Sequence, residues 1–365
     1  MENQTEVYKM ASANLHGFGK SKLEVLMTRI KSLKDVFELN HNELEKETGI
    51  SSGIFQRMKR AHALDQGFKN MEFNHIHGIR SLFFTEKSYP YQLKECKDAP
   101  IHLNLLGEIN IRDQKIIAIV GTRKCSTQSQ YIVDRFISEL KGSDIVVVSG
   151  LAAGIDTHVH ESCLKHKVKT LAVLGHGLNM IYPQHNRTLA KNIVEEGGGL
   201  LTEFNFEERP NKYTFPQRNR IIAGISDATI VIESPLKGGA MITAELANGY
   251  SREVMAFPNS ILNEQLAGCN ALVKKNQASL ITEAKDLFEL MNWNPGIRLL
   301  KESSIELSSE EHALMEIIGA SNSLHIDEII KVSELKVSKI PALLLQLELK
   351  DLIFSQPGLF YVPRH

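Results

Sequence analysis

From residue 115 onward the sequence alternates short, almost uninterrupted apolar runs with longer amphipathic stretches. Runs that are apolar at every residue fit strands buried on both faces, as in parallel sheets covered by helices. Because parallel strands are joined by right-handed crossovers, the pattern predicts an α/β fold with a Rossmann-like, doubly wound parallel sheet. The predicted strands are 116–120, 145–148, 170–174, 229–232 and 254–257.

Residues 1–72 contain no such runs and show the apolar spacing of helices, as at Leu23, Leu26 and Ile30. We therefore predict an N-terminal helical domain of the helix-hairpin-helix or SAM-like kind. Its segment Leu15–Lys20 reads apolar-x-Gly-x-Gly and opens a helix, where backbone amides can meet a DNA phosphate. A plain helical turn that uses glycine for positive φ fits the same residues. The sequence leaves both interpretations open.

The strand runs lie within 73–295, which we predict to be the Rossmann-like domain. A polar stretch follows, and we interpret 296–307 as a linker. Residues 308–365 then show three helical stretches and two short extended pieces, the outline of a winged helix. The helix near 338–349 is rich in leucine and poor in the Arg and Lys expected of a helix that reads a major groove. We expect a structural or protein-contact role for this winged-helix domain.

Charge and cysteine content exclude several classes of protein. Lys and Arg total 42 against 43 Asp and Glu, a formal net charge of -1, which excludes binding of nucleic acid through bulk positive charge but not a local basic cleft. The 4 cysteines contain no Cys-x-x-Cys pair, which favours reduced thiols over disulfides or a zinc site. The polar start lacks a signal-peptide core and the apolar runs are too short to cross a bilayer. We therefore expect a cytoplasmic protein that does not bind membranes.

Glycines and polar residues gather at the carboxyl ends of the predicted strands, where open α/β sheets bind ligands. The turn after the first strand lacks the Gly-x-Gly-x-x-Gly fingerprint of dinucleotide sites, so no nicotinamide cofactor is expected. It couples a guanidinium with hydroxyls, a combination that suits a phosphate. With the turns after the next two strands, it predicts one anion-binding groove. The candidate residues of these turns are Gly121, Thr122, Arg123, Ser126, Gly150, Gly154, Gly175, Gly177 and Asn186.

Two later segments extend the predicted groove. The polar segment 215–224 contains two arginines, and the loop that starts near residue 237 is rich in glycine and leads into a helix, as phosphate cradles do. An alternative for the arginines is a structural clamp on a buried carboxylate such as Asp156 or Glu203. The candidate residues of these segments are Arg218, Asn219, Arg220, Lys237, Gly238, Gly239 and Thr243.

The order of these motifs resembles the bacterial DNA-processing protein A family (DprA, or Smf). The resemblance covers about 75–290, and the terminal modules match the family's usual arrangement. The family often has glycine where Asn259 stands and Ser or Thr where Cys269 stands, and neither departure touches the arginines. The matching motifs are Val120-Gly121-Thr122-Arg123; Ser149-Gly150-Leu151-Ala152-Ala153-Gly154-Ile155-Asp156 with His160; Gly175-His176-Gly177 with Tyr182-Pro183 and Asn186; Phe215-Pro216-Gln217-Arg218-Asn219-Arg220; Ile242-Thr243-Ala244; and Gly268-Cys269-Asn270 with Leu272.

The resemblance implies a homodimeric protein that binds single-stranded DNA without cutting it. Such proteins protect incoming DNA and help load the RecA recombinase during natural transformation. The residues agree, because single-strand binding requires a positive groove along the backbone, and Arg123, Arg218 and Arg220 can supply its charge. We therefore expect no catalytic residue, metal or cofactor.

An enzyme that acts on nucleotides is the alternative. The stretch 238–245 is similar to the Pro-Gly-Gly-x-Gly-Thr-x-x-Glu motif of phosphoribohydrolases on a similar sheet. Ile242 replaces the glycine before Thr243, and Glu245 follows that threonine by two residues instead of three, a rotation of about 100° on a helix. A second alternative is a metal site, although hydrogen-bonded or exposed helix residues are the favoured interpretation of its members. These are Asp156, His158, His160 and Glu161.

Overall fold

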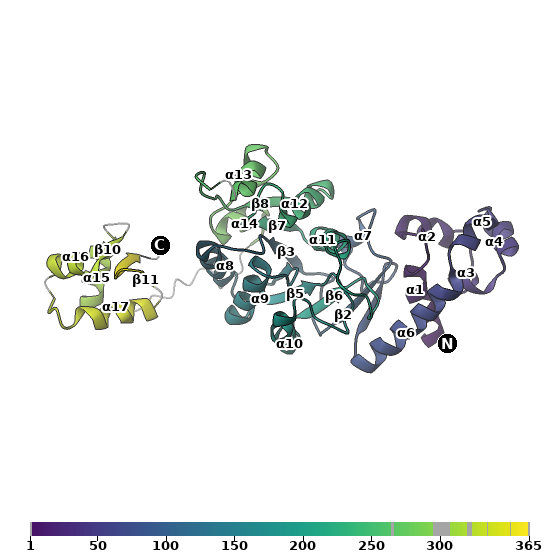
Figure 1. Cartoon of the computed structure of the whole chain (residues 1–365), viewed down its shortest axis with the longest axis horizontal. Coiled ribbons are helices and arrows are strands. Elements are labelled where there is room, and N and C mark those ends of the chain that lie inside the picture. Colours follow the sequence, from purple (N-terminus) through teal and green to yellow (C-terminus); the bar gives the residue numbers. More distant parts are fainter. Residues whose placement is uncertain are drawn as a thin grey trace. The chain divides into compact units, whose positions relative to one another are not determined.

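The computed structural model describes residues 2–263, 266–294, 307–319, 323–333, 335–350 and 352–363 (Figure 1). The chain divides into two compact units, Met1–Leu299 and Leu300–His365. Of the predicted linker 296–307, only Leu307 lies within the described residues.

The N-terminal part of the first unit is helical, as predicted. Its buried apolar residues include Leu23, Leu26 and Phe55. Helix α6 packs against α1 and continues through residue 72, where we predicted a domain boundary. Asn74 on α6 donates a hydrogen bond of 2.7 Å to Asn104 of the sheet. The helices are α1 (Glu2–Ala13), α2 (Lys20–Met27), α3 (Asp35–Glu38), α4 (His41–Thr48), α5 (Ser52–Arg57) and α6 (Arg60–His77).

A sheet of nine described strands forms the centre of this unit, in the order β1-β2-β6-β5-β4-β3-β7-β8-β9. All neighbours from β6 to β9 are parallel, whereas β1 and β2 pair antiparallel to each other and β2 to β6. The strands are β1 (Arg80–Phe83), β2 (His102–Leu106), β3 (Lys115–Val120), β4 (Ile145–Ser149), β5 (Lys169–Val173), β6 (Gly199–Thr202), β7 (Ala228–Val231), β8 (Glu253–Ala256) and β9 (Ser279–Leu280).

The five predicted strands are confirmed as β3, β4, β5, β7 and β8, each within one residue of its expected bounds. The sequence pattern missed the antiparallel edge and β6. Strands β1, β2 and β6 contain a single β-branched residue among them, Thr202, so they lack the composition that indicates a strand.

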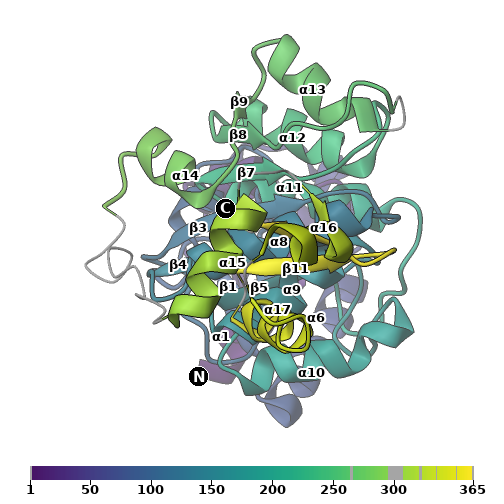
Figure 2. The same cartoon turned by 90° about the vertical axis from the view of Figure 1, so that its left-hand side faces the viewer.

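Helices cover both faces of the sheet, as the doubly wound fold requires. Ile117 and Ile119 of β3 pack with α8, α9 and α14, whereas Ile116, Ala118 and Val120 pack with α11 and α12 on the opposite face. Figures 1 and 2 show α12 and α13 beside β8 and α10 toward the other end of the sheet. The helices are α7 (Tyr91–Lys94), α8 (Thr127–Glu139), α9 (Ile155–His166), η1 (Gln184–Asn186), α10 (Arg187–Glu195), α11 (Thr214–Ile225), α12 (Gly239–Gly249), α13 (Ala267–Lys274) and α14 (Ala284–Leu290).

The chain reverses its direction across the sheet between β3 and β7. From β3 it steps outward through β4 and β5 to β6, and it then returns to place β7 on the other side of β3. The carboxyl ends of β3 and β7 therefore flank a topological switch point, the position at which open α/β sheets bind ligands.

The second unit has the predicted winged-helix elements. A three-stranded antiparallel sheet, in the order β10-β12-β11, accompanies three helices. Leu344 and Leu347 are buried in the module's own core, while Leu345 and Leu349 are exposed. None of the described helices, in either unit, has the length and apolar character needed to span a membrane. The elements are α15 (Ser309–Gly319), β10 (Leu324–His325), α16 (Ile326–Val332), α17 (Ile340–Leu349), β11 (Ile353–Gln356) and β12 (Phe360–Pro363).

Candidate functional site

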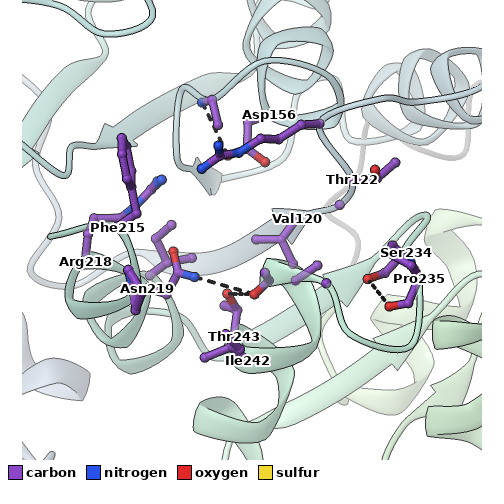
Figure 3. Close-up of a pocket in the computed structure, with 18 of the residues that line it drawn as sticks. Val120, Thr122, Asp156, Phe215, Arg218, Asn219, Ser234, Pro235, Ile242 and Thr243 are labelled. Carbon is purple, nitrogen blue, oxygen red and sulfur yellow. Dashed lines mark hydrogen bonds between the residues drawn. The ribbon is translucent and has the colours of Figure 1, made fainter. Parts of the chain in front are cut away.

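A cavity of about 580 Å³, hereafter the switch-point pocket, opens between the loops that follow β3 and β7 (Figure 3). The start of α11 and the start of α12 complete its walls. Eight of the sixteen predicted site residues line it. They are Gly121, Thr122, Arg123, Arg218, Asn219, Gly238, Gly239 and Thr243.

The cations at the edge of this pocket have no acidic partner among the residues that the structure describes. Arg123 is exposed, and its guanidinium carbon lies 5.3 Å from the centre of the Phe215 ring. Lys212 lines the pocket, and Lys237 is exposed in the loop after β7, outside the lining. The side chains of Arg123, Lys212 and Lys237 form no hydrogen bond or ion pair with any residue that the structure describes. Their positive charge is therefore available to an anionic ligand.

Arg218 forms the floor of the pocket and is only 4% exposed. Its Nη1 donates to the carbonyl oxygen of Val173 at 2.9 Å, and its Nε has no partner among the described residues. Burial lowers the pKa of Arg218 to about 10, against the opposing charge of Asp156, so the side chain stays charged at neutral pH. A Cβ on Gly150 would lie 1.6 Å from Nη1, so this glycine makes room for the arginine.

Two buried titratable residues of α9 lie near Arg218, namely Asp156, which lines the pocket, and His160, which does not. Burial raises the pKa of Asp156, and the charge of Arg218 opposes that shift. His160 is fully buried, and its Nδ1 lies 2.8 Å from the Thr170 hydroxyl. Burial lowers the pKa of His160 to about 3, so its imidazole is neutral near pH 7. The Asp156 carboxylate therefore contributes to the floor of the pocket, whereas His160 does not.

Arg220 occupies a different environment from Arg218, although both lie on α11. It forms an ion pair with Glu203 and donates to the backbone oxygen of Asp98. The side chains of Arg220 and Glu203 are 15% and 11% exposed, and neither residue lines the pocket. For Arg220 the structure therefore shows the carboxylate clamp that the sequence left open.

Several of the predicted glycine and hydroxyl residues hold the loops to one another. Ser126 caps α8 by accepting a hydrogen bond from the Ser129 amide, and its hydroxyl donates to Glu233 at 2.8 Å. Gly154 has φ +83°, and a Cβ there would lie 2.4 Å from the Thr122 carbonyl oxygen. The loop after β4 thus packs on the backbone of the loop after β3.

The third predicted turn does not reach the switch-point pocket. Gly175 and Gly177 are buried, and neither is a lining residue. Asn186 is 2% exposed and donates to the Leu151 carbonyl and the Thr157 hydroxyl, both at 2.9 Å. The three turns thus do not form one continuous groove of accessible backbone amides. Neighbouring atoms occupy the space beside the glycines.

Eleven residues that line the pocket were not among the sixteen predicted site residues, and two of these, Phe215 and Lys212, offer a ring and a cation. Phe215 opens the polar segment that we singled out, so an aromatic residue next to the arginines was the available clue. Lys212 lies in the loop before α11, where no motif marks it. Within the described residues no group of three His, Cys, Asp or Glu is placed to hold a metal ion. Glu245 is exposed on α12 and does not line the pocket.

Two family models match the chain. One, described as DNA recombination-mediator protein A, matches residues 80–292, and the other, described as the DprA winged helix domain, matches residues 300–358. Protein Smf of Synechocystis sp. is 30% identical over 399 aligned residues, with 100% of both chains covered. The DNA processing protein DprA of Streptococcus pneumoniae is 36% identical over 230 residues, which cover 63% of this chain and 79% of that protein.

Two solved structures have the same fold. That of DNA processing protein A from Streptococcus pneumoniae aligns with a TM-score of 0.65 and 32% identity, covering 80% of this chain and 99% of that one. A structure of DNA processing protein A from Helicobacter pylori, reported for its single-stranded DNA binding mode, aligns with a TM-score of 0.53 and 28% identity. It covers 59% of this chain and 97% of that one.

Proposed function

The chain belongs to the DNA recombination-mediator protein A family, DprA/Smf, and from this premise we propose that it binds single-stranded DNA in the switch-point pocket. The observation that carries the proposal is the exposed Arg123 guanidinium, which has no acidic partner among the described residues and lies 5.3 Å from the Phe215 ring centre. A guanidinium attracts phosphate, and an aromatic ring offers a stacking surface that accepts any base.

The backbone at the start of α12 supports the same proposal. Gly238 and Gly239 line the pocket where this 11-residue helix begins, so the amides of its first turn are available to a phosphate in the pocket. The Thr243 hydroxyl donates to the Gly239 carbonyl at 3.3 Å, and Asn219 donates to the same oxygen at 3.5 Å. We infer that these two side chains shape the loop. The backbone amides and the cations at the rim of the pocket, Arg123, Lys212 and Lys237, then contact the DNA.

The finer parts of the proposal rest on membership in the family. We propose that the protein binds DNA without cutting it, protects incoming strands and helps load RecA recombinase, and that it acts as a homodimer. Exposed Glu245 supports the absence of hydrolysis, because the carboxylate that a phosphoribohydrolase would need does not line the pocket. Release of free base from nucleoside monophosphates, abolished in Glu245→Ala, would overturn this part.

A titration tests the binding proposal directly. Full-length protein is titrated into fluorescein-labelled single-stranded and duplex oligonucleotides at several salt concentrations. We expect preferential binding of the single strand and a steep loss of affinity as salt rises, since each phosphate contact releases a counterion. Equal affinity for duplex, or affinity that does not change with salt, contradicts the proposal.

The RecA role has its own experiment. The rate of ATP hydrolysis by RecA is measured on single-stranded DNA that has been coated beforehand with a single-strand-binding protein. Adding this protein is expected to shorten the lag before hydrolysis begins, and Arg123→Ala to shorten it less. An unchanged lag with wild-type protein that binds DNA normally contradicts RecA loading while leaving the binding proposal intact.

A further inference from the structure

A second cavity, of about 640 Å³, lies in the loops that follow β5 and β6. Its lining includes Tyr182, Gln184, Arg187 and Arg209. Arg187 is the first residue of α10, whereas Arg209 comes from the loop before α11, so two separate segments bring their guanidinium groups to one cavity. Apart from Tyr182, none of these residues was a motif member or a site candidate at the level of sequence. We call this cavity the arginine pocket.

The two guanidinium groups of the arginine pocket are in the same situation as the cations at the rim of the switch-point pocket. Arg187 and Arg209 are exposed, and neither side chain forms a hydrogen bond or ion pair within the part of the chain that the structure describes. The acidic residues nearest to Arg209 along the chain, Glu207 and Glu208, are exposed and make no ion pair with either arginine among the described residues. Two unpaired arginines in one cavity are a place for the phosphates of an anionic chain.

A ring contact joins this cavity to the switch-point pocket. Tyr182 is 48% exposed, and the centre of its ring lies 5.8 Å from that of Phe215, with an angle of 47° between the ring planes. Phe215 in turn lies under the guanidinium of Arg123. Successive contacts therefore lead from Arg123 through Phe215 to Tyr182, which lines the arginine pocket. Alternating cations and aromatic rings suit the repeating phosphates and bases of a single strand.

The tyrosine is held in place by a neutral histidine. The Tyr182 amide donates to Nε2 of buried His176 at 3.2 Å, while Nδ1 of the same ring lies 2.9 Å from the Gly177 carbonyl oxygen. One tautomer satisfies both contacts, with the proton on Nδ1. Gly177 also donates to the backbone oxygen of Glu208, so the loop that carries Tyr182 is tied to the loop that carries Arg209. The second cavity is therefore preformed.

We propose that a single DNA strand bound in the switch-point pocket continues across Phe215 and Tyr182 and places its next phosphates on Arg187 and Arg209. The proposal rests on the proposed function, because it extends that binding site by a second subsite. It assigns Tyr182 the role of a stacking platform between the two pockets. It also gives the bound strand a direction across the protein surface, from the ends of β3 and β7 toward the end of β5.

The test compares oligonucleotide lengths in full-length protein. Labelled oligothymidines of roughly 4 and roughly 16 nucleotides, which bracket the footprints of single-strand-binding folds, are titrated at one salt concentration. Arg187→Ala combined with Arg209→Ala is expected to weaken binding of the long strand about tenfold and to leave the short strand unaffected. Losing two phosphate contacts should also lower the slope of log affinity against log salt by about 1.4 for the long strand.

Matched variants separate the subsite from general charge loss. Lys191→Ala removes a cation of the same helix that is already paired with Glu195 at 3.5 Å, and it should bind both strands as the wild type does. Tyr182→Leu should weaken the long strand at least about fivefold, and Tyr182→Phe should restore it, because stacking needs the ring and not the hydroxyl. Melting temperatures of all variants establish that they are folded.

The outcomes distinguish this inference from the proposed function. Wild-type protein that binds neither strand defeats the proposed function and the subsite with it. Wild-type binding that the double arginine variant leaves unchanged for the long strand overturns the subsite alone. An equal loss for the short and the long strand also overturns it, because both arginines would then belong to the first pocket.

Discussion

The rim of the switch-point pocket and the structure beneath and behind it hold their arginines in opposite ways. At the rim, Arg123 is exposed and stacks on a phenylalanine without an acidic partner among the described residues. Behind it, Arg220 is committed to Glu203, and on the floor Arg218 lies buried near the charge of Asp156. Residues of one type within one site therefore divide into those available to a ligand and those that hold the fold. The partners of each cation, and not its presence, decide between the two.

The largest effect should come from removing a cation behind the rim. Arg220→Ala leaves Glu203 nearly buried without its partner, and breaking such a pair typically costs about 3–5 kcal/mol. Chemical denaturation measured for this variant should show a loss of that order in the free energy of unfolding. Arg123→Ala is the matched control, and an exposed substitution of this kind should change the same quantity by less than about 0.5 kcal/mol. Equal losses of unfolding free energy in the two variants would contradict the distinction between arginines available to a ligand and arginines that hold the fold.

A fall in pH should lower the free energy of unfolding through buried groups near the floor of the pocket and not through those at its rim. Burial lowers the pKa of His160 from 6.5 to about 3. Between these two values the histidine is neutral in the folded protein and protonated in the unfolded chain. The stability that this histidine contributes is therefore complete above about pH 6.5 and is lost as the pH falls toward 3. Between pH 7 and pH 5 it accounts for about 2 kcal/mol of the loss.

Replacing the histidine measures that contribution. In His160→Gln the free energy of unfolding should fall less between pH 7 and pH 5 than in the wild type, by about 2 kcal/mol. The variant keeps a residual pH dependence, because burial also lowers the pKa of His102, to about 4. Identical pH profiles for the two proteins would mean that His160 accepts a proton in the folded state and that the floor is less closed than its burial indicates.

The rim should affect binding without affecting stability. Arg123→Ala removes an unpaired guanidinium and is expected to weaken single-stranded DNA binding about tenfold, or ~1.4 kcal/mol. Because one phosphate contact is lost, the slope of log affinity against log salt should fall by roughly 0.7. Fluorescence titrations at three salt concentrations measure both quantities. A variant that melts at the wild-type temperature and binds as tightly as the wild type would remove Arg123 from the site.

The sequence was sufficient for five parallel strands of the sheet and for the location of the pocket. Continuous apolar runs marked the parallel strands, and the turn at Gly121–Arg123 marked the end of β3, which the structure places at the switch point. The sequence analysis gave Arg218 and Arg220 the same role, although their spacing on one helix predicts different environments. Residues two apart on a helix point about 200° apart, so the two side chains face different surroundings.

Other parts of the site depend on contacts that one sequence does not reveal. Gly150 looked like a phosphate-binding glycine, yet it leaves space for a guanidinium contributed by a helix far along the chain. No motif includes Lys212, Arg187 or Arg209, and only the folded chain brings them to the two cavities. A glycine or a cation thus has a role that depends on its neighbours in space.

The smallest effect concerns the C-terminal module, in which two lysines have acidic partners, as Arg220 has. Lys339 forms an ion pair with Glu310 at 2.7 Å, and Lys350 forms one with Glu311 at 2.6 Å. A lysine that already has a carboxylate partner gains little from a phosphate, because the two anions compete for it and few counterions are released. We therefore expect this module to add little to the affinity for DNA.

Removal of the C-terminal module tests whether a lysine that has a carboxylate partner contributes to DNA binding. A protein that ends near Ser303 lacks the whole winged-helix module and should keep its affinity for single-stranded DNA to within about twofold, or ~0.4 kcal/mol. Binding curves of the full-length and shortened proteins, recorded side by side at one salt concentration, measure the difference, and a melting curve checks that the first unit is folded. A loss of about tenfold or more, ~1.4 kcal/mol, would place DNA contacts in the winged helix. Lysines with a carboxylate partner would then bind phosphate. The contrast between cations that have an acidic partner and cations that lack one would hold only for the arginines of the first unit.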